Sequence, residues 1–73
     1  MTLKDLTLVM SGNVQIVVEY KAENIFKGCV DDFYNNDIYY QGKEIDTSIF
    51  LQKVVSHVFY NTIYAAIWIE IED

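Results

Sequence analysis

Arginine and proline are absent from this chain of 73 residues, and cysteine and histidine occur once each. All basic residues are therefore lysines, and the net charge is −6. A protein without a basic face cannot displace counterions from nucleic-acid phosphates, and arginine is the preferred group for bidentate phosphate capture, so general DNA or RNA binding is not expected. The single cysteine, Cys29, excludes an intrachain disulfide and is typical of a reducing compartment. No linker or low-complexity tract interrupts the sequence, which predicts one domain over residues 1–73.

Long apolar runs and a secretory leader are also missing. Lys4 is the only positive charge near the start of the chain, and Asp5 follows it directly. No apolar run reaches the ~18 residues that a membrane-spanning helix requires. We therefore expect a cytoplasmic protein that does not associate with membranes.

Apolar side chains, by contrast, are abundant: they make up 52% of the residues, and aromatic residues make up 15%. A domain of this length buries only about 60% of the surface of its unfolded chain, and small scaffolds without disulfides or metals often depend on partner subunits. Part of the apolar surface should therefore be covered by another chain. The composition predicts a homo-oligomer, or a protein that binds a partner.

The first third of the chain predicts a helix and a hairpin. Thr2 can cap a helix that has Asp5 in its first turn, and apolar residues then recur at helical spacing, which predicts a helix over residues 2–11. Alternation with a period of two predicts a strand over 14–20. After a polar break at 21–24, a second strand is predicted over 25–30, paired antiparallel with the first.

In the rest of the chain, the segment 31–52 has a less regular pattern than the residues that follow it. In the segment 31–52, Asp31 and Asp32 are interpreted as turn-formers, Tyr39 and Tyr40 as a short edge strand, and residues 46–52 as a capped helical turn. Residues 54–60 and 63–72 predict two strands that meet at a tight turn at residues 61–62. The fold class is therefore α+β: an N-terminal helix packed on a mainly antiparallel sheet of about four strands, in the order α-β-β-(short helix)-β-β.

Strict alternation in the last strand assigns its two faces. The core face is predicted to contain Ile63, Ala65, Ile67, Ile69 and Ile71. The opposite face, expected to form a subunit interface or a ligand surface, is predicted to contain Tyr64, Ala66, Trp68, Glu70 and Glu72. Amphipathic rings suit both interfaces and the stacking of bases. The candidate ligand- or partner-binding residues are Tyr34, Tyr39, Tyr40, Tyr64 and Trp68.

No constellation of residues predicts catalysis or a metal site. His57 is expected on the same strand face as Val55 and Phe59, with Ser56 on the other face, so a Ser-His pair cannot form. The interpretation of His57 is therefore a partly buried or interfacial residue that makes one hydrogen bond. Lys27 is the only basic residue near Cys29, and reactive cysteines need a more basic environment, which disfavours a nucleophile.

The acidic side chains give no better indication of a metal site. Asp31, Asp32 and Asp37 lack the spacing of a calcium loop: with Asp32 counted as the first position of the loop, the twelfth is Lys43 rather than a glutamate. The acidic C-terminal end is interpreted as a solubilising strand end rather than a phosphate mimic. We expect no enzyme activity, no metal and no cofactor.

Four segments resemble a group of small phage and prophage proteins from Gram-positive bacteria. They are Thr2-Leu3-Lys4-Asp5-Leu6, Val14-Gln15-Ile16-Val17-Val18, Ile25-Phe26-Lys27-Gly28-Cys29-Val30-Asp31-Asp32-Phe33 and Ala66-Ile67-Trp68-Ile69-Glu70-Ile71. The resemblance implies an N-terminal helix followed by "V-x-I-x-V", "F-x-G-x-V-x-D" and "I-x-I-x-I" strands. Small phage proteins of this kind commonly look like inhibitors of host systems, which would place the chain in the host cell cytoplasm.

The sequence therefore leads to one main functional hypothesis and two alternatives. The main hypothesis is a non-enzymatic, oligomeric phage-type protein that counters a bacterial antiviral defence by binding and blocking a host defence protein. In the first alternative, an oligomeric sponge sequesters a nucleotide immune signal; net acidity and the absence of arginine disfavour this phosphate-rich ligand. In the second, the chain is a structural or assembly subunit that joins copies of itself or a virion component through its aromatic face.

Overall fold

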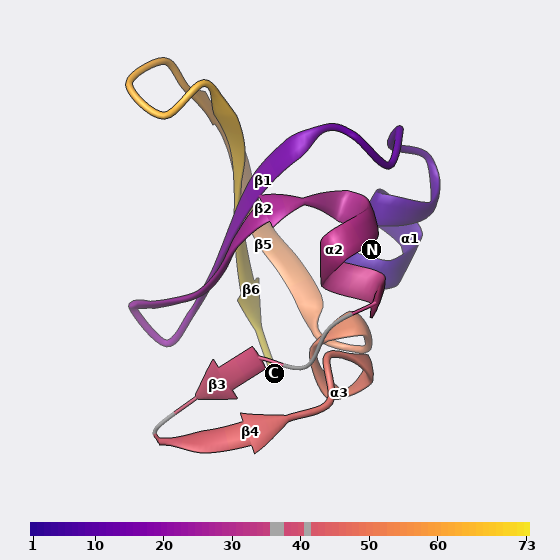
Figure 1. Cartoon of the computed structure of the whole chain (residues 1–73), viewed down its shortest axis with the longest axis vertical. Coiled ribbons are helices and arrows are strands. Elements are labelled where there is room, and N and C mark those ends of the chain that lie inside the picture. Colours follow the sequence, from indigo (N-terminus) through magenta and orange to yellow (C-terminus); the bar gives the residue numbers. More distant parts are fainter. Residues whose placement is uncertain (36–37, 41) are drawn as a thin grey trace.

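The computed structural model describes residues 1–35, 38–40 and 42–73, with only the backbone described for 38–40. Its central element is a twisted four-stranded sheet, and the helices lie on one side of that sheet (Figure 1). The other side of the sheet carries no helix among the described residues. The predicted α+β class is confirmed.

The first helix, α1 (Leu3–Leu8), begins with the predicted cap. The Thr2 hydroxyl accepts a hydrogen bond from the Asp5 backbone N–H at 3.2 Å, and the Asp5 carboxylate accepts one from the Thr2 N–H at 3.1 Å. This reciprocal capping box satisfies two N–H groups that a helix start otherwise leaves unpaired. The helix is shorter than the predicted 2–11, because it ends at the C-cap Val9, whose N–H bonds back to Leu6.

The sheet has the strand order β2-β1-β6-β5. Strands β1 (Gln15–Tyr20) and β2 (Glu23–Cys29) form the predicted antiparallel hairpin, and β5 (Val54–Asn61) and β6 (Ala66–Glu72) form a second one. The two hairpins join through β1 and β6, which run parallel. The sheet is therefore mainly antiparallel, as predicted, with one parallel pairing in its centre that local sequence patterns do not predict.

The middle of the chain contains more regular structure than its turn-forming residues indicate. Asp31 and Asp32 are not in a turn: they occupy the first turn of a helix, α2 (Val30–Asn35), where carboxylates favour the positive end of the helix dipole. The predicted edge strand at Tyr39–Tyr40 is present as β3 (Ile38–Tyr40), which pairs with β4 (Lys43–Ile45) in a separate two-stranded sheet. The predicted helical turn is present as α3 (Ser48–Leu51).

The hairpin between β5 and β6 differs from the predicted tight turn. Residues 62–65 form a longer connection, in which the Asn61 side chain accepts hydrogen bonds from the N–H groups of Ile63 and Tyr64. The connection ends at Ala65, whose φ is 51°. The prediction of Ile63 and Ala65 as core residues is therefore wrong: Ile63 is 87% exposed, and Ala65 is exposed as well.

Strand β5 contains an irregularity that changes its faces. The register with β6 shifts between Val55 and His57, so Ser56 is an extra residue in the strand, a β-bulge. Val55 pairs with Ile71 and packs against the core, whereas His57 pairs with Glu70 on the opposite face. The prediction that Val55 shares a face with His57 and Phe59 is wrong for this reason.

The hydrophobic core fills the space between the sheet and the helices. Each helix contributes a fully or nearly fully buried residue, namely Leu3 from α1, Phe33 from α2 and Phe50 from α3. The sheet contributes alternating residues of its two central strands: Ile16, Val18, Tyr20, Ile69 and Ile71. This confirms the predicted core face of the last strand for its final residues. In the described parts of the chain, the helices are too short to cross a bilayer.

Candidate functional site: an aromatic patch on the open face of the sheet

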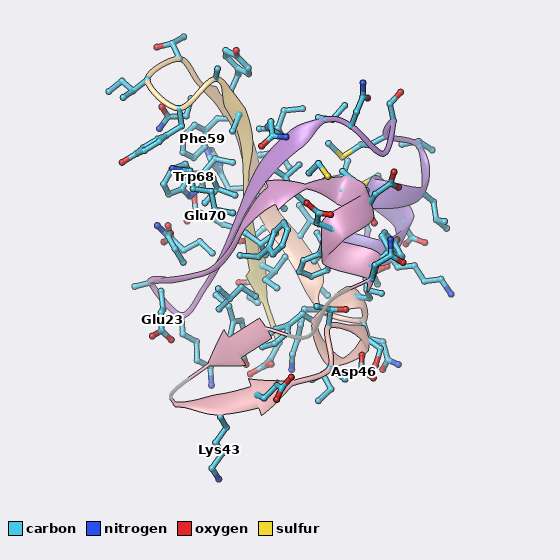
Figure 2. All side chains as sticks on the ribbon, viewed as in Figure 1. Glu23, Lys43, Asp46, Phe59, Trp68 and Glu70 are labelled. Atoms are coloured by element: carbon cyan, nitrogen blue, oxygen red, sulfur yellow. The ribbon has the colours of Figure 1, made fainter. Side chains whose placement is uncertain are left out.

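One side of the sheet carries no helix in the described parts of the chain, and we call it the open face. The register places Lys27 of β2 beside Val17 of β1, Val17 beside Trp68 of β6, and Trp68 beside Phe59 of β5. Figure 2 shows Phe59, Trp68 and Glu70 projecting from the sheet on the side away from the helices. A row of side chains with one member from each strand thus runs across the whole sheet.

Three rings of this face form what we call the aromatic patch, in which Phe59 and Tyr64 each contact Trp68. The rings of Phe59 and Trp68 stack with their centroids 5.9 Å apart and their planes inclined by 15°. Tyr64 extends from the β5–β6 connection and lies 5.8 Å from Trp68. Phe59 remains 39% exposed and Tyr64 remains 50% exposed. The patch therefore combines fixed ring geometry with accessible apolar surface.

Tyr64 also links the patch to the far edge of the sheet. The ammonium of Lys27 lies 4.5 Å from the centre of the Tyr64 ring, within the range of a cation–π interaction. Val17 of β1 lies between Lys27 and Trp68 in the register, and Tyr64 contacts both of these neighbours. Val17 is only 1% exposed, although it points away from the helical core. The patch is therefore a packed surface with a buried valine beneath it.

A hydrogen bond fixes the orientation of the Trp68 ring. Its indole N–H donates to the carboxylate of Glu19 at 3.0 Å. Glu19 and Glu70 occupy neighbouring register positions on β1 and β6, so two carboxylates lie along one side of the patch. Among the described residues, Lys27 is the lysine that contacts the patch. The rim of the patch is thus more acidic than basic, as is the whole chain.

Of the five predicted binding residues, the structure brings two together. Tyr64 and Trp68 are in contact in the patch. Tyr34 belongs to α2 on the helical side, where its hydroxyl shares a hydrogen bond of 2.6 Å with that of Thr7. The side chains of Tyr39 and Tyr40 lie outside the described residues. The sheet therefore separates Tyr34 from the aromatic patch.

Phe59, Lys27 and Glu19 also belong to the site, although none of them is among the predicted binding residues. The signal for Phe59 was its alternation with His57 in a predicted strand, but only the register with β6 shows that it lies opposite Trp68. His57 is exposed rather than partly buried, and its ring lies 5.3 Å from that of Phe59. Ser56 uses its hydroxyl to donate to the Glu70 carbonyl, and it makes no catalytic pair with His57.

A second polar cluster lies at the C-terminal end, around the carboxylate of Asp73. This carboxylate accepts hydrogen bonds from the Lys53 ammonium and, at 2.7 Å, from the Tyr20 hydroxyl. These two donors, led by Lys53, lower the pKa of Asp73 to about 2, and the same contact raises the pKa of Lys53. Lys21 also lies 3.7 Å from Asp73. The cluster ties the end of β6 to the end of β1 and is best explained as a structural contact.

Neither the potential metal ligands of the described residues nor the comparisons with known proteins indicate a further functional site. Within residues 1–35, 38–40 and 42–73, no three His, Cys, Asp or Glu side chains gather in a way that could hold a metal ion. Cys29 is a half-buried free thiol at the end of β2, and Asp37 of the acidic segment lies outside the described residues. Comparisons with protein-family models, curated proteins and solved structures found no match to this chain.

Proposed function

We propose that the chain is a non-enzymatic binding protein that engages a partner protein through the aromatic patch. The observation that carries the proposal is that the rings of Phe59 and Tyr64 both contact that of Trp68, on a face of the sheet that no helix of the described residues covers. Tyrosine and tryptophan are enriched among the residues that dominate binding energies at protein interfaces. Such residues are most effective when they are held rigidly before binding, because little side-chain entropy is then lost. The stacked Phe59 and the Glu19-bound Trp68 meet this condition.

The rim of the patch indicates the chemistry of the partner surface. Glu19 and Glu70 lie beside the rings, and Lys27 is held against Tyr64. A complementary surface would offer an apolar pocket for the rings, with lysine or arginine side chains around it, because opposite charges steer association and fix the orientation of binding. The resemblance to phage proteins directs the proposal further, to a host defence protein that the chain blocks.

Photo-crosslinking in bacterial cells tests the proposed binding surface and identifies the partner. A photoreactive amino acid replaces Tyr64, which is 50% exposed in the patch, or Ile49, which is 53% exposed on α3 on the other side of the sheet. We expect a defined host protein to be crosslinked from position 64 and not from position 49. Equal crosslinking from both positions, or none from position 64, would contradict the proposal.

The purified partner then allows a quantitative test with matched variants. Tyr64→Ala should weaken binding at least tenfold, because an interface anchor is worth about 2 kcal/mol or more. Ile49→Ala should leave the affinity unchanged, since it removes a similarly exposed side chain elsewhere. In a host that carries the defence protein, the wild-type chain and Ile49→Ala should restore phage plaques, while Tyr64→Ala should not. Plaque restoration by Tyr64→Ala would separate the patch from the anti-defence function.

One observation supports the nucleotide alternative. Exposed rings beside a lysine can stack a base and contact a phosphate, and Lys27 lies against Tyr64 in this way. Two neighbouring carboxylates oppose an anionic ligand, so we rank this function second. A saturable thermal stabilisation by one nucleotide, lost in Lys27→Ala and Tyr64→Ala alike, would reverse the ranking.

A further inference from the structure

The two edges of the sheet, β2 and β5, differ in how far other parts of the chain cover them. At the β2 edge, charged or polar residues such as Glu23, Asn24 and Lys27 are exposed, and β3 and α2 pack close by. At the β5 edge, the start of the strand is covered by the N-terminus: Thr2 bridges to Val54, and the Val55 N–H donates to the Met1 carbonyl. Beyond this point, from His57 to Asn61, no other strand of the described chain pairs with the outer side of β5.

This free stretch lacks the features that keep sheet edges apart. Natural edge strands are protected by lysines and other charges, by prolines or by bulges. Residues 54–61 contain no lysine, aspartate, glutamate or proline, and the bulge at Ser56 lies before the free stretch. Three consecutive side chains are instead apolar and accessible: Val58 is 44% exposed, Phe59 39% and Tyr60 60%.

We propose that the free edge of β5, from His57 to Asn61, pairs antiparallel with the same edge of a second copy of this chain. The resulting dimer would contain one continuous sheet of twice four strands. The proposal concerns self-association and does not depend on the identity of any other partner.

The polar and apolar residues of the free edge are arranged symmetrically about Phe59, so the segment can pair antiparallel with a second copy of itself. A two-fold axis at Phe59 places His57 opposite Asn61 of the second copy, Val58 opposite its Tyr60, and Phe59 opposite its Phe59. Polar residues therefore meet at both ends, and apolar residues meet in the middle, where such cross-strand pairs stabilise sheets. The imidazole of His57 and the amide of Asn61 can also form hydrogen bonds with each other.

Electrostatics favour this edge over the rest of the surface for contact between two copies. Each copy has a net charge of −6, so like-charge repulsion disfavours most contacts between copies. The free edge contains no lysine, aspartate or glutamate. Self-pairing at this edge therefore brings no carboxylates into direct opposition across the two strands.

The dimer would extend the open face. In an antiparallel pair the two-fold axis is perpendicular to the sheet, so the open faces of both copies lie on the same side. Because Phe59 stacks on Trp68 in each copy, the axis joins the two aromatic patches into one row of rings. A helical layer remains on the opposite side of both copies.

Sedimentation across a range from micromolar to millimolar concentration tests the dimer. The affinity tag belongs at the C-terminus, because Met1 lies beside Val55, and an N-terminal extension would run towards the free edge. We expect the mass to rise from 8.5 kDa towards twice this value with concentration. Val58→Lys should weaken dimerisation at least tenfold, whereas Ile49→Lys, at a side chain of similar exposure, should not. A chain that stays monomeric, or a dimer that is insensitive to Val58→Lys, would overturn the proposal.

Cysteine crosslinking tests the register. In a Cys29→Ser background, Phe59→Cys should form a covalent dimer under mild oxidation, because directly opposite residues have Cβ atoms about 4.5–5.5 Å apart. Ile49→Cys should remain monomeric under the same conditions. Equal crosslinking at both positions would contradict the pairing. If Val58→Lys is a folded monomer that still binds the host protein identified by photo-crosslinking, self-association through β5 and partner binding through the aromatic patch are shown to be independent.

Discussion

In the turn between β1 and β2, the backbone conformation determines whether a glycine substitution raises or lowers the free energy of unfolding. Lys21 and Ala22 both have positive φ angles, 51° and 62°. This two-residue connection matches the type I′ arrangement, in which asparagine and glycine are the favoured residues. Ala22 is exposed, so its side chain contributes little packing. Replacing it with glycine should therefore stabilise the protein.

The size of the effect follows from two opposing terms. A residue with a Cβ in the left-handed region costs about 1–2 kcal/mol relative to glycine. Glycine in turn increases the entropy of the unfolded chain, which opposes folding by about 0.4–1 kcal/mol. The expected gain for Ala22→Gly is thus about 0.5–1 kcal/mol. For a domain of this size, that corresponds to a rise in melting temperature of roughly 3–6 °C.

Urea and thermal unfolding of two alanine-to-glycine variants measure this effect. The matched control is Ala66→Gly, because Ala66 is 3% exposed at the first position of β6, where it pairs with Asn61 and glycine should cost about 0.5–1 kcal/mol. The same chemical change should therefore shift stability in opposite directions at the two positions. If both variants are destabilised to a similar degree, strain at the turn is not what distinguishes them, and the reasoning is wrong.

Three further predictions concern single polar contacts. Trp68→Phe removes the indole N–H that donates to Glu19, and urea unfolding should show a loss of about 1–2 kcal/mol, since the acceptor is a carboxylate. Thr2→Ala removes the capping box of α1 and should cost about 1 kcal/mol in the same measurement, with reduced helical circular dichroism. Asp73→Asn should be less stable than wild type at neutral pH. Because the folded-state pKa of Asp73 is lowered from 3.8 to about 2, this difference should shrink as the pH falls through that interval. A difference that stays constant down to pH 2 would contradict the assigned contact with Lys53.

Local sequence signals predicted the elements whose causes are themselves local. The Thr2 cap lies within one helical turn of Asp5, and the alternation of β1 and β6 reflects one buried face per strand. By contrast, α2 was not predicted, because adjacent aspartates are compatible both with a turn and with the first turn of a helix. What decides between them is tertiary: Val30 and Phe33 on α2 are buried in the core.

The candidate site was predicted only in part, for a related reason. Tyr64 and Trp68 were assigned to one face from alternation within a single strand, and they are in contact. Phe59, Lys27 and Glu19 come from three other strands, and their proximity depends on which strands are neighbours. The parallel pairing of β1 with β6 brings Glu19 to Trp68 and Lys27 to Tyr64, and no turn or cap in the sequence encodes that pairing. Knowledge of the strand order would have been needed to find these residues.

The bulge at Ser56 connects the unusual composition of the chain to both proposed surfaces. A regular strand would direct Val55, His57 and Phe59 to one face, but the extra residue sends Val55 to the core and Phe59 to the open face. Phe59 can then stack on Trp68, while Val58 and Tyr60 point to the helical side at an edge where they remain exposed. Apolar side chains therefore lie on both faces of one uncharged edge strand. In the monomer side chains of both sets remain exposed, since the helices of the described residues cover only one side of the sheet. The surplus of apolar residues is thus concentrated where a second chain can cover it, from the open face or along the edge.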